Sequence, residues 1–182
     1  MKNLTFACIT ACLTILCACT KEPLEEFIPP NGTSSTTNFI VKDSTFVMNP
    51  RVDSANMLAL INAYRSKGCN CGDTWMPPAP PLTWNIRLEK AAWLHSKEMN
   101  DSIYMSHTGK NGSTGGDRIR KMGYNWKSYA ENLALGILTE KTVVAGWMGS
   151  KSHCLAMMNP LLKETCIARI SNYWTQEIGL SY

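Results

Sequence analysis

The chain has 182 residues, of which 45% are hydrophobic and 18% are charged, so it has the length of one domain with accessory segments. Eighteen basic and 14 acidic residues give a formal net charge of +4 at neutral pH. This mild balance, without a run of basic residues, excludes the charged surface that nucleic-acid-binding proteins usually carry. The composition is that of an ordinary globular protein.

Residues 1–18 have the pattern of an export signal. A lysine at position 2 precedes an apolar run that is too short to span a bilayer as a helix. The run ends in Leu-Cys-Ala-Cys, which resembles a bacterial lipobox. We therefore expect a lipoprotein signal peptide and a mature chain whose first residue, Cys19, carries acyl chains such as palmitate. The expected location is the bacterial cell envelope or cell surface, and secretion without lipid is the alternative.

Residues 19–52 are expected to form a tether and a lead-in to the folded domain. Residues 20–38 combine three prolines with Gly, Ser and Thr and show no periodicity, which is typical of a semi-flexible spacer. Residues 39–47 fit either a short strand or an ordered lead-in.

The first helical pattern follows this tether. Asp53 is predicted to cap a helix that Gly68 ends. A rigid, proline-rich connection over residues 68–81 comes next. Asn85 or Thr83 is then predicted to open a second helix.

This second helix is expected to end near Asp101, and it carries His95 on its apolar face. A histidine at that position is more often packed and bonded to a neighbour than a ligand, so His95 is left out of the site. His107 follows in a loop of small polar residues, where a histidine is a fair functional candidate. Asp117 is predicted to cap a short helix that ends at Gly123.

The stretch from residue 128 to residue 154 has the strongest pattern of a site. Glu131 lies in a run of small apolar residues, and a partly buried carboxylate requires a hydrogen-bond donor or a cation. His107 upstream and His153 downstream are the candidate donors.

The remaining elements are two more helices and two strands. Thr139 is predicted to cap one helix, and Ser150 or Ser152 begins another short one. Residues 165–170 and 173–182 have strand patterns and are separated by a turn. Helices first and an antiparallel hairpin last indicate an α+β fold built in layers.

Four cysteines lie outside the export segment, namely Cys69, Cys71, Cys154 and Cys166. In an oxidising envelope an even set is typical of disulfides. We expect a bond from Cys154 to another segment. Cys166 is the favoured partner, because a 12-residue separation is easily closed and because Cys69 and Cys71 are too close to form an unstrained bridge with each other. Cys69 and Cys71 remain open as alternative partners of Cys154. Zinc held by all four is the less favoured alternative, since the Cys69–Cys71 spacing is too short.

Several short motifs, occurring in order, together resemble a known family. They are LINAYR, LTWNIRLEKAAWLHSKEM, SHTG with DRI and GY, AENLA, WMGSKSHC and YWTQ. The likeness is to the cysteine-rich secretory, antigen 5 and pathogenesis-related (CAP) superfamily, and within it to the bacterial SCP-like extracellular proteins and lipoproteins. It implies a CAP domain over residues 53–182, with a three-layer α-β-α sandwich around a central antiparallel sheet.

The resemblance also implies a cleft with two histidines and two acids. His107 matches the first histidine, Glu131 matches the glutamate of a Gly-Glu-Asn motif, and His153 matches the second histidine. Ser150 stands where many eukaryotic members have a second glutamate, and Ala130 replaces the usual glycine. No residue is assigned as catalytic.

Three functions are compatible with such a cleft. The favoured one is a binding module for a divalent metal such as zinc, a lipid or a protein, because two imidazoles and a carboxylate are suitable zinc ligands. A metal-dependent hydrolase or protease is the second, although the sequence has neither a His-Glu-x-x-His helix nor a Gly-x-Ser-x-Gly turn. The third is a purely structural polar network.

Overall fold

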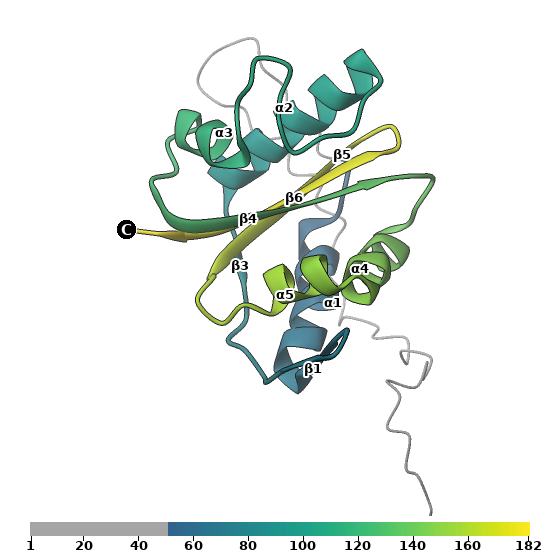
Figure 1. Ribbon diagram of the computed structural model, residues 1–182, viewed down its shortest axis with the longest axis vertical. Helices are drawn as coiled ribbons and strands as arrows, with labels where there is room; N and C mark the ends of the chain where they lie inside the picture. The colour runs from purple at the N-terminus through teal and green to yellow at the C-terminus, as the bar shows by residue number, and fades with distance from the viewer. Residues whose placement is uncertain (1–50) are drawn as a thin grey trace, which may run out of the picture. The chain divides into compact units, whose positions relative to one another are not determined.

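The computed structural model describes residues 51–182 (Figure 1). The predicted export signal, the lipidation site at Cys19 and nearly all of the predicted tether lie outside the described residues. Within residues 51–182, no helix has the length and apolar character needed to cross a membrane.

A four-stranded sheet with the order β3-β5-β6-β4 lies at the centre of the domain. The strands β4 (Trp126–Leu135), β5 (Glu164–Ile170) and β6 (Tyr173–Ser181) are antiparallel neighbours. The short β3 (Thr83–Trp84) pairs with β5 in parallel. The predicted C-terminal hairpin is confirmed, and the antiparallel sheet has one parallel strand at its edge.

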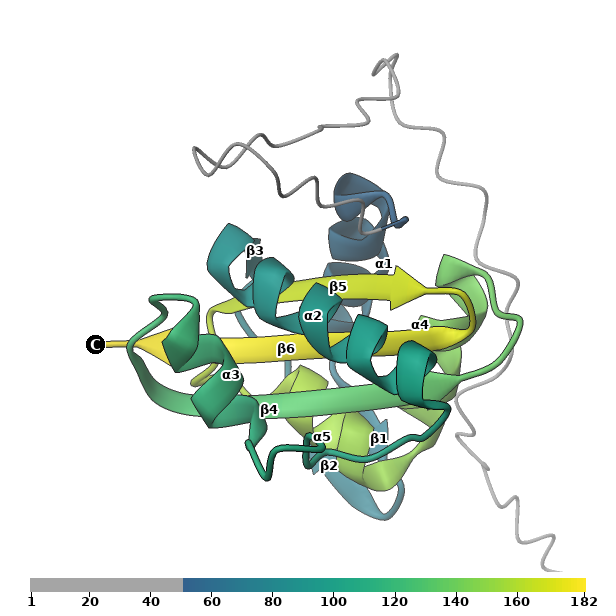
Figure 2. The same ribbon diagram turned by 90° about the horizontal axis from the view of Figure 1, so that it is seen from above.

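Helices cover both faces of this sheet (Figures 1 and 2). On one face, α2 (Ile86–Ser102) packs on β5 and β6, and α3 (Gly115–Lys121) packs on α2 and β4. On the other face lie α1 (Ser54–Lys67), α4 (Glu140–Gly149) and α5 (Lys151–Met158). The predicted three-layer α-β-α sandwich is therefore confirmed.

A separate two-stranded sheet occupies the segment that the sequence indicates to be a proline-rich connection. β1 (Cys69–Cys71) pairs antiparallel with β2 (Thr74–Met76), and Gly72, with φ +62°, lies in the turn between them. Cys69 and Cys71 are both buried because residues two apart on a strand share a face.

Most predicted helix caps are confirmed. Asp53, Asn85 and Thr139 each accept backbone N–H bonds at the start of α1, α2 and α4. The prediction for α3 is wrong, because Thr114 is its N-cap and Asp117 lies three residues later as the second half of a capping box. The helix therefore begins two residues before Asp117.

Apolar side chains fill the space on both sides of the sheet. The cluster on the α1, α4 and α5 side includes Met57, Ile61, Trp147, Ile167, Trp174 and Ile178. The cluster under α2 and α3 includes Leu88, Ala91, Ala92, Ile119, Tyr124 and Cys166. Burial of both clusters fixes the sheet between the two helical layers.

The buried Arg65 of α1 adds polar contacts on the α1 side. Its guanidinium donates to the carbonyls of Pro80, Met157, Asn159 and Leu162 over 2.6 to 3.2 Å. Burial lowers the pKa of Arg65 to about 10. These bonds tie α1 to the loop before β3, to the end of α5 and to the connection between α5 and β5.

Candidate functional site

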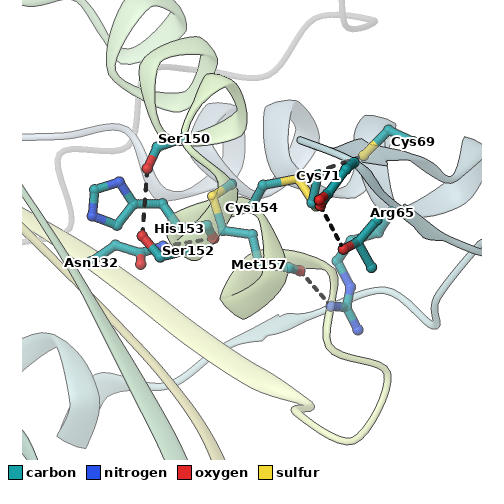
Figure 3. The surroundings of a disulfide bond; sticks show 11 residues. Arg65, Cys69, Cys71, Asn132, Ser150, Ser152, His153, Cys154 and Met157 are labelled. Carbon is teal, nitrogen blue, oxygen red and sulfur yellow. Dashed lines mark hydrogen bonds between the residues drawn. A yellow bond between two sulfur atoms is a disulfide. The ribbon is translucent and has the colours of Figure 1, made fainter.

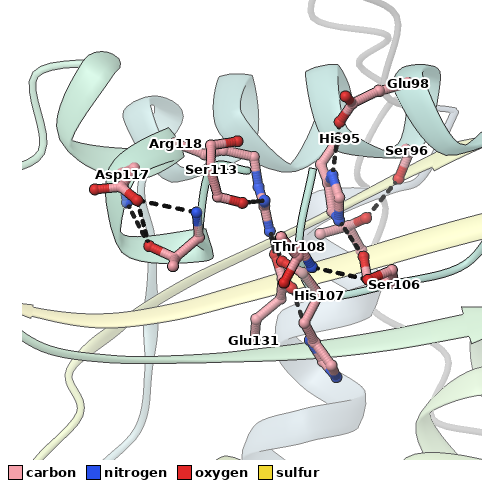
Figure 4. Close-up of polar contacts among 12 residues, drawn as sticks. His95, Ser96, Glu98, Ser106, His107, Thr108, Ser113, Asp117, Arg118 and Glu131 are labelled. Atoms are coloured by element: carbon pink, nitrogen blue, oxygen red, sulfur yellow. Dashed lines mark hydrogen bonds and ion pairs between the residues drawn. The ribbon is translucent and has the colours of Figure 1, made fainter. Parts of the chain in front are cut away.

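Glu131 lies on the edge strand β4, directly opposite Glu177 of β6. Its side chain is only 4% exposed, as its apolar sequence neighbours predict. The Oε1 atom lies 2.7 Å from Nδ1 of His107, so the loop histidine is one of its partners (Figure 4). The ring of His107 is 62% exposed, which makes it the solvent-facing member of the pair.

The second partner of Glu131 is Arg118 of α3, which the sequence reading missed. Arg118 donates through Nη2 to Glu131 Oε2 and to the backbone carbonyl of His107, the latter at 3.0 Å. Its Nη1 donates to the carbonyl of Ser113 at 3.0 Å. One guanidinium therefore fixes both the acid and the loop that carries His107 (Figure 4).

Two glycines at the start of α3 allow this helix to approach β4. A Cβ atom on Gly116 would lie 2.7 Å from the Tyr129 ring, and one on Gly115 would lie 3.1 Å from the same ring. A side chain at Gly116 would therefore push α3, and with it Arg118, away from Glu131.

These contacts set the protonation states of Glu131 and His107. Burial disfavours the charged form of Glu131, but the His107 bond and the Arg118 charge outweigh it and hold its pKa below the usual range. The bond to Glu131 raises the pKa of His107 in turn, against partial burial and the Arg118 charge. Glu131 is therefore an anion at neutral pH, and His107 is easier to protonate than an isolated histidine.

The third predicted residue, His153, lies on α5 across the edge strand. Consecutive residues of a strand point to opposite faces of the sheet. Glu131 points toward Arg118, whereas the next residue, Asn132, points to the other face and donates to the His153 carbonyl at 3.4 Å (Figure 3). Burial and the charge of His107 lower the pKa of His153. The charge of His107 thus acts on His153 around the edge of β4, although the two imidazoles belong to different layers.

Glu177 is a second buried acid that the sequence reading missed. Its side chain is fully buried, and Glu131, directly opposite on β4, is the acid that it faces. Burial, the nearby charge of Glu131 and a hydrogen bond with that carboxylate raise the pKa of Glu177 well above the usual range. Glu177 is therefore the neutral carboxyl of the facing pair, and Glu131 is the ionised one.

The buried His95 supports the loop from behind, as the sequence predicts for a packed histidine. Its Nε2 lies 2.9 Å from the carbonyl of Ser106, the residue before His107, and its Nδ1 lies 3.4 Å from Glu98. Burial, together with the Arg118 charge, lowers the pKa of His95. Its role here is to hold the loop.

Comparison with known proteins identifies the family. The model of the cysteine-rich secretory protein family, CAP, matches residues 58–178. The chain belongs to the CAP family. Its relatives include the uncharacterized protein YkwD of Bacillus subtilis (strain 168), 29% identical over 99 residues, and the uncharacterized membrane protein YlbC of the same organism, 26% identical over 95 residues. These alignments cover 53% and 52% of this chain but only 38% and 28% of the relatives, so the chain spans well under half of each.

Solved structures show the same CAP fold. An extracellular protein containing an SCP domain from Bacillus anthracis has a TM-score of 0.62 at 24% identity, with 69% of this chain and 39% of that chain covered. An outer surface protein from Borrelia burgdorferi has a TM-score of 0.57 at 19% identity, with 72% and 97% covered. A cysteine-rich secretory protein from Staphylococcus aureus has a TM-score of 0.52 at 17% identity, with 72% and 40% covered.

The disulfide of this CAP domain joins Cys71 of β1 to Cys154 of α5 (Figure 3). The expected bond from Cys154 to another segment is present, but Cys166 as its partner is wrong. Cys166 is buried in the cluster under α2, whereas Cys154 lies on α5 on the other side of the sheet. The sheet separates the two sulfurs although only 12 residues separate them in the chain.

Ser150 takes a helix-end position in the CAP domain but makes no side-chain cap to α5. Its Oγ lies 3.5 Å from the Oγ of Ser152. Ser150 is therefore the residue at which α5 begins, as one of the two predicted positions, although its hydroxyl does not cap the helix.

Metal-ligand atoms of the CAP domain converge at another place than the predicted cleft. Within residues 51–182, one group of three or more metal-ligand atoms lies within 4.8 Å of one another. It consists of the sulfurs of Cys69, Cys71 and Cys154, and the last two of these form the disulfide. His107, Glu131 and His153 do not form such a group. Any ion at the cleft would therefore have to be held by fewer than these three residues as they stand.

Proposed function

We propose that this chain is an exported CAP-family binding module that holds a divalent metal ion such as zinc between His107 and His153, at the edge of β4. The observation that carries the proposal is the 2.7 Å bond from His107 Nδ1 to Glu131, made by a ring that is 62% exposed. An imidazole that binds zinc through one nitrogen is normally held by a carboxylate or carbonyl through the other. The His107–Glu131 pair has this arrangement, with Nε2 left for a ligand.

The residues fit such an ion as two imidazoles backed by a carboxylate, and not as the three-ligand set that the sequence indicates. Both oxygens of Glu131 already have partners, in His107 and Arg118. Glu131 would therefore orient His107, and water or a bound ligand would complete the coordination. Zinc bound there would supply Lewis acidity toward a carbonyl, carboxylate or phosphate group of a lipid or protein ligand.

The electrostatics of the site support an ion that competes with protons. Both imidazoles have to be neutral to bind a metal. The lowered pKa of His153 keeps its ring neutral at physiological pH, while the raised pKa of His107 makes this ring the first to protonate as the pH falls. His107 is thus expected to set the pH at which metal binding weakens.

A hydrolase or protease that uses the same edge has less support. The hydroxyl of Ser150 faces Ser152 at 3.5 Å, and the acid Glu131 is ion-paired with Arg118, which opposes its service as a general base. Binding without turnover is therefore the function that we assign, and catalysis becomes a matter for substrate screening if a metal site is established.

Calorimetric titration of the full chain with zinc at pH 7.5 and pH 5.5 tests the proposal. Binding in the micromolar range or tighter is expected at pH 7.5, with a loss of at least about tenfold for His107→Ala or His153→Ala and of about 10- to 100-fold for Glu131→Gln. The variant Cys69→Ser is the control, because it removes a sulfur ligand and leaves both imidazoles in place. An unbound wild-type chain, or a double histidine variant that binds as wild type, contradicts the proposal and leaves the network with a structural role.

The proposed location is the cell envelope, with the module anchored through lipid on Cys19. The secretory name of the family and the extracellular and outer-surface relatives support this location. Substitution Cys19→Ser is expected to move the protein from the membrane fraction to the soluble one. An unchanged distribution would show that lipid on Cys19 is not the anchor.

A further inference from the structure

Three cysteine sulfurs lie together where the β1–β2 hairpin meets α5 (Figure 3). Cys71 and Cys154 form the disulfide, and Cys69 retains its thiol. The Sγ of Cys69 lies 3.8 Å from the Sγ of Cys154, which is van der Waals contact between sulfur atoms. A thiol in contact with a disulfide is placed to exchange with it.

The local structure explains why two cysteines can reach the same partner. Cys69 and Cys71 are two residues apart on β1, so their side chains leave the strand on the same face, and both are buried against α5. A bond between Cys69 and Cys71 themselves is disfavoured because their spacing along the strand does not allow the geometry of an unstrained disulfide. Cys154 is therefore the sulfur that both of them compete for.

We infer that Cys69, Cys71 and Cys154 form an internal thiol–disulfide exchange site in which Cys154 alternates between Cys69 and Cys71. The Cys69 thiolate attacks the Sγ of Cys154, the Cys69–Cys154 bond forms as the Cys71–Cys154 bond breaks, and Cys71 leaves as a thiolate. Cys71 then takes up a proton to replace the one that Cys69 lost. One disulfide and one thiol are present before and after, so the step has no need of an oxidant or reductant.

The three sulfurs form a triangle, with each within 4.8 Å of the others, whereas exchange passes through a linear arrangement of the attacking, central and leaving sulfurs. A side-chain rotation of Cys69 is therefore part of the step. The exposed ion pair between Asp73 in the hairpin turn and Lys151 of α5 is a weak restraint on that adjustment.

Exchange would change how α5 is fastened to the hairpin. Moving the attachment from Cys71 to Cys69 shifts it by two strand residues, or about 6.6 Å along β1. Cys154 directly follows His153, so the two disulfides hold the histidine in two different positions. The exchange itself does not rest on the proposed metal binding, since it involves sulfur atoms alone.

The decisive experiment is disulfide mapping of the folded full chain carrying Cys71→Ser, oxidised in air and alkylated after denaturation in acid. A Cys69–Cys154 disulfide is expected in most molecules, with Cys166 still alkylated as a thiol. The matched control Cys69→Ser should keep Cys71–Cys154. Near-ultraviolet circular dichroism establishes that each variant is folded, and a folded Cys71→Ser chain with both Cys69 and Cys154 alkylated overturns the inference.

The wild-type chain gives a second test that does not depend on the stability of a variant. After incubation at pH 8.5 and acid quenching, peptides linked through Cys69–Cys154 are expected beside those linked through Cys71–Cys154. Because the thiolate is the attacking form, the rate of their appearance should rise about tenfold per pH unit below the thiol pKa. A map that contains only Cys71–Cys154 after prolonged incubation at this pH overturns the inference.

Discussion

Arg65 and Arg118 are both buried arginines, yet they use their guanidinium groups in different ways. Arg65 is 0% exposed and donates to four backbone carbonyls. Arg118 is 9% exposed and divides its bonds between two carbonyls and the carboxylate of Glu131. Arg65 thus fastens backbone segments to one another, whereas Arg118 joins a backbone loop to an ionised side chain.

The difference determines what each charge can influence. The charge of Arg65 faces carbonyl dipoles, and none of the polar contacts described for it reaches a titratable side chain. The charge of Arg118 acts on Glu131, on His107 and on the deeper Glu177. Burial of a cation therefore does not by itself mark a site, and its connection to a solvent-facing titratable group such as His107 does.

Substitution Arg65→Met should have the largest effect on stability. It leaves four carbonyls, on three segments, without their donor, and each buried unsatisfied group costs about 1 to 3 kcal/mol. With partial relaxation we expect a loss of about 3 to 5 kcal/mol in the free energy of unfolding, measured by denaturant titration. The exposed Arg120→Met is the control and should change it by less than about 1 kcal/mol. A similar loss in both variants would mean that the carbonyl bonds of Arg65 contribute little.

Substitution Arg118→Met should have a smaller effect on stability and a distinct effect on the site. We expect a loss of about 2 to 3 kcal/mol, because the two carbonyls of the loop and the carboxylate of Glu131 are nearer to solvent. The charge of Arg118 lowers the pKa of His107, so its removal should raise that pKa, as followed by NMR titration of the ring protons. Arg65→Met, in a folded sample, should leave the His107 titration unchanged. An unchanged His107 titration in Arg118→Met would mean that Arg118, like Arg65, only fastens backbone segments together and does not act on the site.

The sequence predicted the parts of the fold that depend on neighbours in the chain. Asp53, Asn85 and Thr139 cap their helices through N–H groups two or three residues away, and the β5–β6 hairpin closes over a short turn. Glu131 was recognised as a partly buried acid for the same reason, since its apolar neighbours indicate burial. Local chemistry is sufficient for such predictions.

The features that the sequence did not predict depend on which segments face each other. Glu177 becomes the partner of Glu131 only through the register of β4 and β6, which a strand pattern does not specify. Arg118 reaches Glu131 because Gly115 and Gly116 bring α3 close to β4. The disulfide prediction failed because proximity in sequence favoured Cys166, on the far side of the sheet from Cys154.

Substitution Glu177→Gln tests whether the single charge of Arg118 serves Glu131 alone. The carboxyl groups of Glu131 and Glu177 face each other beside the guanidinium of Arg118. Because the pKa of Glu177 is raised in the folded chain, there is a pH range in which Glu177 is neutral in the folded chain and ionised in the unfolded chain. Below about pH 4.5 both states are protonated and the pH-dependent cost of Glu177 is absent, whereas above that value the wild type loses stability until the folded pKa is passed. An amide of the same shape does not ionise, so the variant should become more stable than the wild type as the pH rises from 4.5 to 7.

The gain at pH 7 is expected to be about 1 to 3 kcal/mol in the free energy of unfolding, because each pH unit over which only the unfolded chain ionises is worth about 1.4 kcal/mol, with the two proteins closer together at pH 4. Glu98→Gln is the control, and its effect on stability should have the opposite sign. Burial raises the pKa of Glu98, but the hydrogen bonds that it accepts outweigh burial and lower this pKa overall. Loss of the Glu98 carboxylate should therefore lower the free energy of unfolding at pH 7, and by less at pH 4. A Glu177→Gln chain that is destabilised to the same extent at every pH would show that Glu177 is ionised beside Glu131. Arg118 would then have to neutralise two carboxylates, and its contrast with Arg65 would be greater than the bonds alone indicate.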